Sequence, residues 1–299
     1  MTMPQPAAHD ILVPVAPQRS IPSAATVTAL PTVRTARVRH YLMCRPTYFE
    51  VSYAINPWMD PDHPVNVELA MRQWESLRDA YRSLGHRVDE ITAVPGLPDM
   101  VFAANGATVI DGKALGAQFK YPQRADEAPA YRAWLERAGY EVQVAKSIHE
   151  GEGDLLFSER YVLAGTGFRT EVTAHAEAQE YFGRPVITLR LVDPRYYHLD
   201  TALFVLDEEN VAYFPGAFSP GSREALTRLF PDAVPADETD AAVLGLNAVS
   251  DGRHVVLPAE AKGLARALTE RGYEPVPVEL SELRKAGGGP KCCTLELRP

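Results

Sequence analysis

The chain of 299 residues has little cysteine and few long apolar stretches, and each scarcity excludes a class of protein. Three cysteines, two of them adjacent, are too few for a disulfide framework, so we expect reduced thiols and a cytoplasmic protein. No stretch approaches about 18 consecutive apolar residues, and no basic segment followed by an apolar one opens the chain. We therefore expect neither a membrane span nor a secretory signal.

Basic residues are also in deficit, because the formal net charge at pH 7 is -9. Nucleic-acid binding requires a basic face for the phosphates, so nucleic acid is not the expected partner. The net charge says little else about partners, and the sequence leaves a homo-oligomer open.

The first 36 residues differ in composition from the rest of the chain. They are rich in proline and alanine and show no periodicity, which is typical of a mobile tail. We predict a tail at residues 1–36 and a single domain at residues 37–299.

Within residues 37–299, a helical pattern followed by a breaker and a β-type segment recurs five times. The helices are predicted at 67–84, 129–138, 171–182, 222–230 and 259–271, and the breakers are Gly85, Gly139, Gly183, Pro231 and Gly272. Glycine directly after the last periodic residue is typical of a helix C-terminus, because it adopts the left-handed conformation at little cost.

Hairpins are predicted at the same phase of the repeat. Asp111-Gly112 and Asp251-Gly252 mark tight turns between β-type runs, and residues 155–165 and 201–213 indicate hairpins with longer loops. Five units of strand, hairpin and helix close most simply around an axis, with helices outside and strands lining the centre.

Residues at the same position within each of the five units should then converge on that axis. They are Asn105, Asp154, His198, Asn247 and Cys292. A thiol, an imidazole, a carboxylate and two amides together provide a nucleophile, a proton shuttle and groups that hold a polar, cationic substrate.

Each of these residues also has a structural interpretation. Cys292 beside Cys293 is typical of a buried small side chain, and a lone His198 is more often structural than catalytic. Against this, Gly287-Gly288-Gly289 before Cys292 permits close backbone approach. The spacing of the cysteines matches no zinc ligand set, so we expect no metal.

Five segments then resemble a known superfamily: PDMVFAANGA, EGEGD, GTGFRT, YYHLDTALF and GGGPKCCTLEL, in this order. Residues 37–298 resemble the guanidine-modifying enzymes, or penteins, which include arginine deiminase, dimethylarginine dimethylaminohydrolase and the amidinotransferases. The stretch LMCRPTYFEVSYAINPWM is similar to the arginine dihydrolase branch. The resemblance implies an α/β fold, the five-bladed pseudo-symmetric α/β propeller, in agreement with the repeat.

The resemblance also implies roles for individual residues. Cys292 would be the nucleophile and His198 the general acid and base. The superfamily's acidic motif is usually one residue shorter than EGEGD, so either Glu150 or Glu152 would orient His198, and we favour Glu150. The substrate-binding set that we predict is Asp99, Phe102, Asn105, Arg124, Asp154, Arg169 and Asp200.

Within this set, Asp99 and Phe102 would line the slot and Asp200 would bind the guanidinium. Arg169 would clamp the substrate carboxylate, with Arg124 as a second candidate, because a guanidinium fork matches a carboxylate bidentately.

The chemistry fits these roles. Carboxylates that grip the substrate NH groups localise the guanidinium charge, and a thiolate can attack the carbon. We expect cationic surroundings, helped by His198 and by the charge of the bound substrate itself, to lower the pKa of Cys292. His198 would protonate the departing amine and then activate water to hydrolyse the covalent thiouronium, so no cofactor is needed.

One position separates the subtypes. Deiminases and dimethylaminohydrolases carry aspartate where this chain has Asn105. An amide both donates and accepts hydrogen bonds, so it can hold the guanidinium and then the neutral ureido intermediate. Asn105 therefore favours an arginine dihydrolase, which yields ornithine, CO2 and two ammonia. Hydrolysis of Nω-methylarginine is the alternative, followed by amidinotransfer and by a non-catalytic arginine-binding module.

Overall fold

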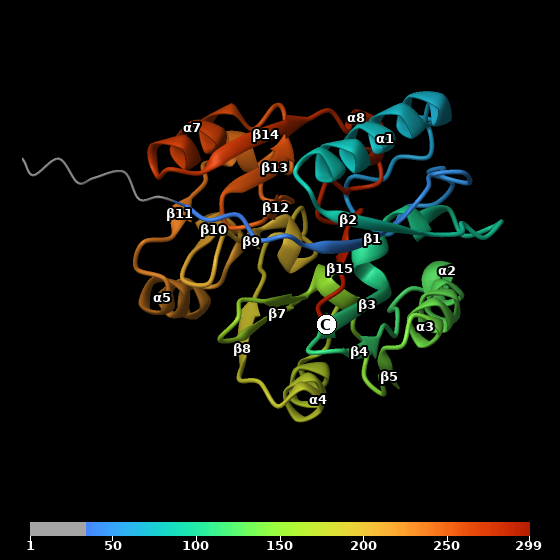
Figure 1. Cartoon of the computed structure of the whole chain (residues 1–299), viewed down its shortest axis with the longest axis horizontal. Helices are drawn as coiled ribbons and strands as arrows, with labels where there is room; N and C mark the ends of the chain where they lie inside the picture. Colours follow the sequence, from blue (N-terminus) through green and yellow to red (C-terminus); the bar gives the residue numbers. More distant parts are fainter. Residues whose placement is uncertain (1–33) are drawn as a thin grey trace, which may run out of the picture. The chain divides into compact units, whose positions relative to one another are not determined.

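Five longer helices lie around the periphery of the computed structural model, which describes residues 34–299 (Figure 1). They are α1 (Val67–Ser83), α3 (Glu127–Arg137), α4 (Val172–Phe182), α5 (Pro220–Leu229) and α7 (Lys262–Glu270). Each lies at a predicted position and differs from it by a few residues at the ends. The four predicted breaker glycines all have positive φ, between 62° and 93°, which confirms their expected role after the helices.

Fifteen strands form five sheets of three strands within the described residues. The sheets contain, in spatial order, β15 (Leu295–Glu296), β1 (His40–Cys44) and β2 (Arg87–Ile91); β3 (Ala107–Ile110), β4 (Lys113–Gly116) and β5 (Glu141–Val144); β6 (Leu155–Phe157), β7 (Val162–Thr166) and β8 (Val186–Arg190); β9 (Leu203–Val205), β10 (Val211–Tyr213) and β11 (Val234–Pro235); and β12 (Val249–Ser250), β13 (His254–Pro258) and β14 (Glu274–Val278).

All five sheets share one topology. An inner strand pairs antiparallel with the middle strand, and the chain then passes through a helix to an outer strand that runs parallel to the middle one. Neighbouring inner strands contact one another around the centre, from β15 through β3, β6 and β9 to β12. The predicted five-bladed α/β propeller is confirmed.

One blade combines the two ends of the described chain. In it, β15 pairs antiparallel with β1, and Leu295 lies opposite Leu42. The sequence predicts the other four hairpins but not this pairing, because its two strands are separated by nearly the whole domain. The C-terminal segment thereby brings Cys292 to the axis.

Short helical turns lead into the inner strands. The 3₁₀ turns are η1 (Pro98–Val101), η2 (Ala103–Gly106), η3 (Gly151–Gly153), η4 (Leu199–Thr201) and η5 (Pro215–Ala217), and the short α-helices are α2 (Pro122–Ala125), α6 (Glu238–Ala241) and α8 (Ser281–Arg284). Three of the turns, η2, η3 and η4, directly precede the inner strands β3, β6 and β9, and η3 contacts both of the others. Of the residues predicted to converge on the axis, Asn105, Asp154 and His198 lie in or directly beside these turns.

The predicted tail lies outside the described residues except for positions 34–36. Arg34 forms an ion pair with Asp207 at 2.7 Å, and its guanidinium lies over the Tyr273 ring. The boundary at residue 36 stays a prediction. Among residues 34–299, no helix combines the length and the apolar character that a membrane crossing requires.

Candidate active site

The side chains that the repeat predicted at the axis are buried together. Asn105, Asp154, His198, Asn247 and Cys292 are each at most 2% exposed. Hydrogen bonds among them and their neighbours link all five blades, so the predicted convergence is observed in the fold.

The turn that carries Cys292 is fixed by an amide from the neighbouring blade. Asn247 accepts hydrogen bonds through Oδ1 from the backbone N–H groups of Gly289 and Cys292, both at 3.0 Å. Its Nδ2 lies 3.1 Å from the Cys292 Sγ. Asn247 thereby holds both the backbone and the sulfur of the expected nucleophile, a role that sequence analysis did not assign to it.

The glycines before Cys292 are required by close approach. A Cβ added to Gly288 would lie 2.1 Å from the ring of Phe102, and one added to Gly289 would lie 3.0 Å from Asn247 Oδ1. Phe102 is 4% exposed and also packs edge-on against Phe49. The predicted slot residue Phe102 therefore lies against the glycine-rich run.

The protein's own groups keep the Cys292 thiol protonated. Burial raises the pKa of Cys292 well above its ordinary value, and the Asp200 carboxylate, whose Oδ2 lies 3.2 Å from Sγ, raises it further. The prediction is therefore wrong for the protein's own groups, whereas the lowering of this pKa by the charge of a bound substrate stays a prediction. Burial also raises the pKa of Asp200, to about 6, against the opposing charge of His198.

His198 contacts two acidic side chains. Its Nε2 lies 2.9 Å from Glu150 Oε2 and 3.8 Å from Asp154 Oδ2. Its Nδ1 is buried without a hydrogen-bond partner among residues 34–299. Glu152 points elsewhere and pairs with Lys291 and Arg298. Of the two glutamates, Glu150, the one favoured above, is thus the one that contacts His198, and its catalytic role stays a prediction.

Glu150 is held ionised. Burial alone would raise its pKa, but the Arg169 guanidinium at 2.7 Å and His198 hold the pKa well below its ordinary value. Glu150 Oε1 accepts a hydrogen bond from the backbone N–H of Lys120 at 3.2 Å. An ionised carboxylate only accepts hydrogen bonds, so Nε2 of His198 is the donor in this contact.

Both carboxylate oxygens of Asp154 accept hydrogen bonds from protein groups. Oδ1 accepts from the backbone N–H of Leu199 at 2.9 Å, and Oδ2 accepts from the Thr170 hydroxyl at 2.8 Å. These bonds tie the turn after β5 to the segment carrying His198. The geometry favours a role in orienting His198 over the predicted contact with substrate.

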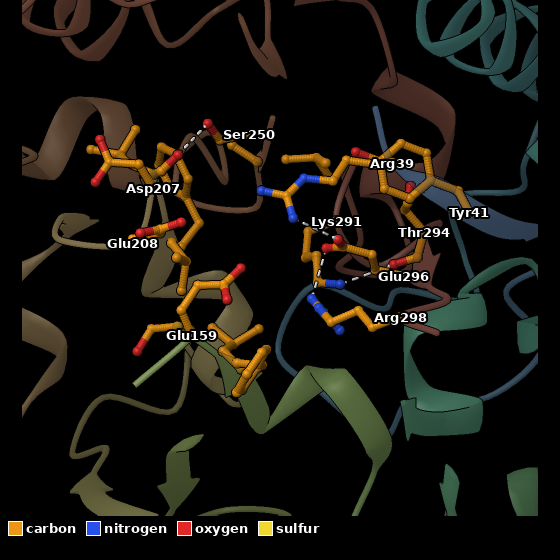
Figure 2. Close-up of a pocket in the computed structure, with 18 residues that line it drawn as sticks. Arg39, Tyr41, Glu159, Asp207, Glu208, Ser250, Lys291, Thr294, Glu296 and Arg298 are labelled. Atoms are coloured by element: carbon orange, nitrogen blue, oxygen red, sulfur yellow. Dashed lines mark hydrogen bonds and ion pairs between the residues drawn. The ribbon is translucent and has the colours of Figure 1, made fainter. Parts of the chain in front are cut away.

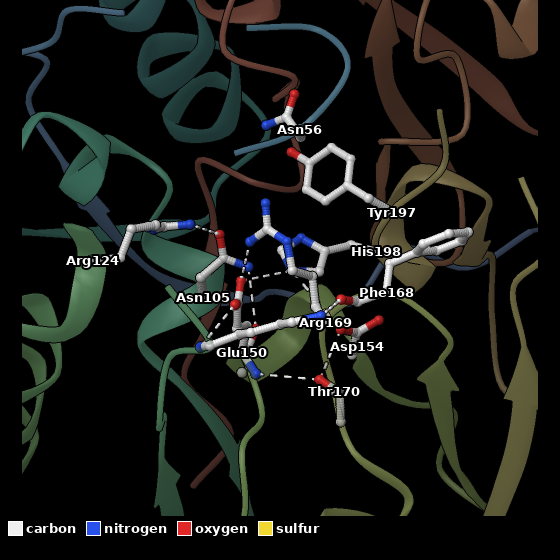
Figure 3. Close-up of polar contacts among 12 residues, drawn as sticks. Asn56, Asn105, Arg124, Glu150, Asp154, Phe168, Arg169, Thr170, Tyr197 and His198 are labelled. Atoms are coloured by element: carbon white, nitrogen blue, oxygen red, sulfur yellow. Dashed lines mark hydrogen bonds and ion pairs between the residues drawn. The ribbon is translucent and has the colours of Figure 1, made fainter. Parts of the chain in front are cut away.

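Asn105 is held at both ends of its amide (Figure 3). Nδ2 donates to the backbone carbonyl of Glu150 at 3.1 Å, and Oδ1 accepts from Arg124 Nη1 at 2.8 Å. Arg124 in turn donates two 2.8 Å bonds to the buried Glu127 and one to the backbone carbonyl of Asp99. Sequence analysis missed Glu127, although its spacing of three residues from Arg124 signals a helical ion pair.

Three atoms of the predicted site residues are buried without a hydrogen-bond partner in the described part of the chain: Asp99 Oδ1, His198 Nδ1 and Asp200 Oδ1. The other oxygen of Asp99 accepts from the Tyr53 hydroxyl at 2.8 Å. Burial raises the pKa of Asp99 as well. Orphaned buried acceptors are rare and costly, and this set of acceptors matches a ligand that carries only N–H donors, such as a guanidinium.

The segment between β1 and α1 closes over these residues. Arg169 lies between the rings of Tyr121 and Tyr197 and donates to the backbone carbonyl of Ile55 at 2.9 Å. Asn56 from the same segment donates to the carbonyl of Ala286 at 3.0 Å. Cys292 is 2% exposed, so the thiol is closed off from solvent in this structure.

Comparison with known proteins shows the family to which the chain belongs. A family model described as "N,N dimethylarginine dimethylhydrolase, eukaryotic" matches residues 45–227. The chain is 53% identical over 269 residues to an N(G),N(G)-dimethylarginine dimethylaminohydrolase of Mycobacterium tuberculosis, covering 90% of this chain and 89% of that protein. The protein is thus a pentein hydrolase that acts on amidine C–N bonds. It belongs to the dimethylarginine dimethylaminohydrolase family.

Arginine dihydrolases are also similar to this chain. It is 35% identical over 272 residues to the bifunctional arginine dihydrolase/ornithine cyclodeaminase AgrE of Nostoc sp., covering 88% of this chain but 38% of that longer protein. The substrate-bound N-terminal domain of ArgZ, a cyanobacterial arginine dihydrolase, superimposes with a TM-score of 0.84 at 32% identity, covering 87% and 98% of the two chains. A Pseudomonas aeruginosa dimethylarginine hydrolase, at 17% identity and a TM-score of 0.74, shares the fold.

Proposed function

We propose that the protein hydrolyses the guanidinium of free arginine twice at Cys292 and releases ornithine, CO2 and two ammonia. The observation that carries this proposal is the amide of Asn105, fixed by Arg124 and by the Glu150 carbonyl. An aspartate at position 105 would place a carboxylate oxygen where Nδ2 now donates to the Glu150 carbonyl, so two acceptors would face each other. The site therefore favours an amide over a carboxylate. An amide suits both a cationic substrate and a neutral ureido intermediate.

The substrate guanidinium would lie between Asp99 and Asp200, and the unpartnered oxygen of each would accept its N–H groups. Its positive charge beside Asp200 offsets the carboxylate that raises the pKa of the Cys292 thiol. Substrate binding therefore favours the thiolate, and the thiol proton would pass to His198. The enzyme's nucleophile is activated by the charge of its own substrate.

In the first cycle, the sulfur of Cys292 bonds to the guanidinium carbon, and the C–N bond to a terminal nitrogen breaks. His198 gives its proton to that nitrogen, and ammonia leaves from a covalent thiouronium. His198 then takes a proton from water, which attacks the same carbon and displaces the sulfur. The product still bound in the site is a ureido group.

In the second cycle, Asn105 would donate its remaining Nδ2 hydrogen to the ureido oxygen and retain the group. Cys292 attacks again, the second terminal nitrogen leaves as ammonia, and water hydrolyses the thiocarbamate. The resulting carbamate loses CO2 and leaves ornithine. Each cycle consumes one water, and neither needs a cofactor.

The α-carboxylate of arginine would be bound by Arg169, with Arg124 as the second candidate. Arg169 donates to Glu150 and to the carbonyl of Ile55. Movement of the segment that carries Ile55 would free one edge of that guanidinium. The fork of an arginine side chain matches a carboxylate bidentately.

Hydrolysis of methylated arginine is the second candidate, and both the matching family model and a named relative favour it. The relative from Mycobacterium tuberculosis that is 53% identical is named as a dimethylarginine dimethylaminohydrolase. That reaction would use the same thiol and histidine, expel an alkylamine in the first cycle and stop at citrulline. We further propose a cytoplasmic location, where Cys44, Cys292 and Cys293, all buried and free, stay reduced.

Product analysis tests the proposal. The protein is incubated separately with arginine and with asymmetric dimethylarginine, and ornithine, citrulline, ammonia and dimethylamine are quantified. Two ammonia and one ornithine per arginine support the dihydrolase. Citrulline and dimethylamine from the methylated substrate, with no ornithine from arginine, would replace it with the second candidate. Turnover of neither substrate would overturn both.

A further inference from the structure

The segment EGEGD carries two buried glutamates that face different parts of the protein. Glu150 contacts His198, as described above, whereas the carboxylate of Glu152 accepts hydrogen bonds from Lys291 Nζ and Arg298 Nη1. It also accepts from the backbone N–H of Glu296 at 3.1 Å. Both glutamates are completely buried and lie at the same turn, η3.

All three donors to Glu152 come from the C-terminal segment that carries Cys292. Lys291 directly precedes Cys292, and its Nζ also donates to the carbonyl of Thr294 at 3.0 Å. Arg298 donates to Glu296 at 2.7 Å as well. The carboxylate of Glu152 thus ties η3 to both ends of the nucleophile's turn.

These contacts lie away from the predicted substrate site. Lys291, Thr294, Glu296 and Arg298 line a cavity of about 60 Å³, and among residues 34–299 none of the predicted site residues lines it (Figure 2). Glu152 therefore does not meet the substrate. Burial would raise its pKa, but Arg298 and Lys291 hold the pKa below its ordinary value, so the ion pairs persist at neutral pH.

We propose that Glu152 is a positioning residue that fixes the Cys292 turn relative to His198. The turn η3 holds His198 through Glu150 and holds the Cys292 segment through Glu152, so one rigid element sets the separation of nucleophile and base. Displacement of reacting groups by about 1 Å can cost on the order of 10²-fold in rate. The proposal rests on the proposed function only in taking Cys292 as the nucleophile.

The test is Glu152→Gln in the full chain, with arginine and asymmetric dimethylarginine as substrates. We expect kcat to fall roughly 10- to 100-fold while KM changes less than about threefold, because Asp99, Asp200 and Arg169 are untouched. Iodoacetamide should alkylate Cys292 at least about threefold faster, since the turn that buries the thiol is loosened.

Loss of one partner from a buried ion pair is destabilising, so a charge-balanced variant is measured as well. Glu152→Gln combined with Lys291→Met removes one charge of each sign and should show the same fall in kcat. Asp251→Asn is the matched control, because Asp251 is a buried, ion-paired carboxylate in the turn between β12 and β13. It should leave kcat and alkylation within about twofold of wild type.

A merely structural role for Glu152 predicts a different pattern. Thermal stability would fall, but kcat per folded molecule and the alkylation rate would stay within about twofold of wild type in both Glu152 variants. That result would overturn the proposal. If the wild type turns over neither substrate, the proposed function fails, whereas the alkylation comparison still decides the role of Glu152.

Discussion

Two buried carboxylates differ in their hydrogen-bond partners and in the direction of their pKa shifts. Asp200 lies at the axis, and Asp251 lies in the turn between β12 and β13. Asp251 accepts hydrogen bonds from His254 and from the backbone N–H groups of Arg253 and His254, and lies 3.4 Å from His86. Burial would raise its pKa, but these partners hold it well below its ordinary value.

Asp200 has no such set of partners. One of its oxygens meets the Cys292 thiol, and the other is unsatisfied among the described residues. Burial raises its pKa to about 6. An ionised Asp251 stabilises the fold and an ionised Asp200 costs stability, so the difference marks Asp200 as a group kept for a cationic ligand.

Replacement of the Cys292 thiol, which lies beside Asp200, should lower kcat more than any other substitution. Cys292→Ser is expected to lower kcat by roughly 10⁴-fold or more, because a buried serine hydroxyl is a far weaker nucleophile than a thiolate. Steady-state assay of ammonia release measures this, with circular dichroism to verify folding. Cys293→Ala is the control and should keep kcat within about tenfold of wild type; equal losses in the two variants would contradict the assignment.

Asp200→Asn should slow turnover and at the same time make the thiol more reactive. We expect kcat/KM for arginine to fall on the order of 10²- to 10³-fold, since the guanidinium loses a charged partner. Iodoacetamide alkylation of Cys292 should accelerate, because the neighbouring charge that raises the pKa of the thiol is gone. Unchanged or slower alkylation would show that Asp200 does not control the thiol.

The same variant tests the stability side of the comparison. The folded pKa of Asp200, about 6, exceeds the unfolded value of about 4, so the folded protein binds more protons and loses stability as pH rises between these values. Asp200→Asn should therefore raise the free energy of unfolding by on the order of 1–2 kcal/mol at pH 8 and not below pH 4. Urea unfolding at both pH values measures the difference.

Asp251→Asn should have the opposite effect on stability and the opposite pH dependence. We expect a loss of about 1–3 kcal/mol in the free energy of unfolding at pH 7, with kcat within about twofold of wild type. Its folded pKa is depressed, so the stabilisation is present above the unfolded value of about 4 and is lost as pH falls below it. A constant deficit from pH 7 down to pH 3, measured by urea unfolding, would refute this account.

The repeat and most of the site were predictable from local signals. The breaker glycines and the Asp-Gly turns gave the phase of each unit, and phase alone selected Asn105, Asp154, His198, Asn247 and Cys292. The blade closed by β15 and β1 was not predictable, because no local pattern reports a pairing of strands this far apart in the chain.

Electrostatic detail was the least accessible to sequence. The choice between Glu150 and Glu152 depends on how η3 turns, and the pKa of Cys292 depends on burial and on the proximity of Asp200. Tyr53 and Glu127 were missed because their partners, Asp99 and Arg124, are recognisable only once the segments are packed together.

The proposal that the amide of Asn105 permits two cycles is tested most directly by the products of Asn105→Asp. We predict that wild type yields two ammonia per arginine as ornithine forms, and that the variant releases citrulline with one ammonia. Asn210→Asp is the matched control, because the amide of Asn210 also donates to a backbone carbonyl, that of Asp232 at 3.0 Å. It should leave the product ratio unchanged. An unchanged ornithine yield from Asn105→Asp would contradict the account.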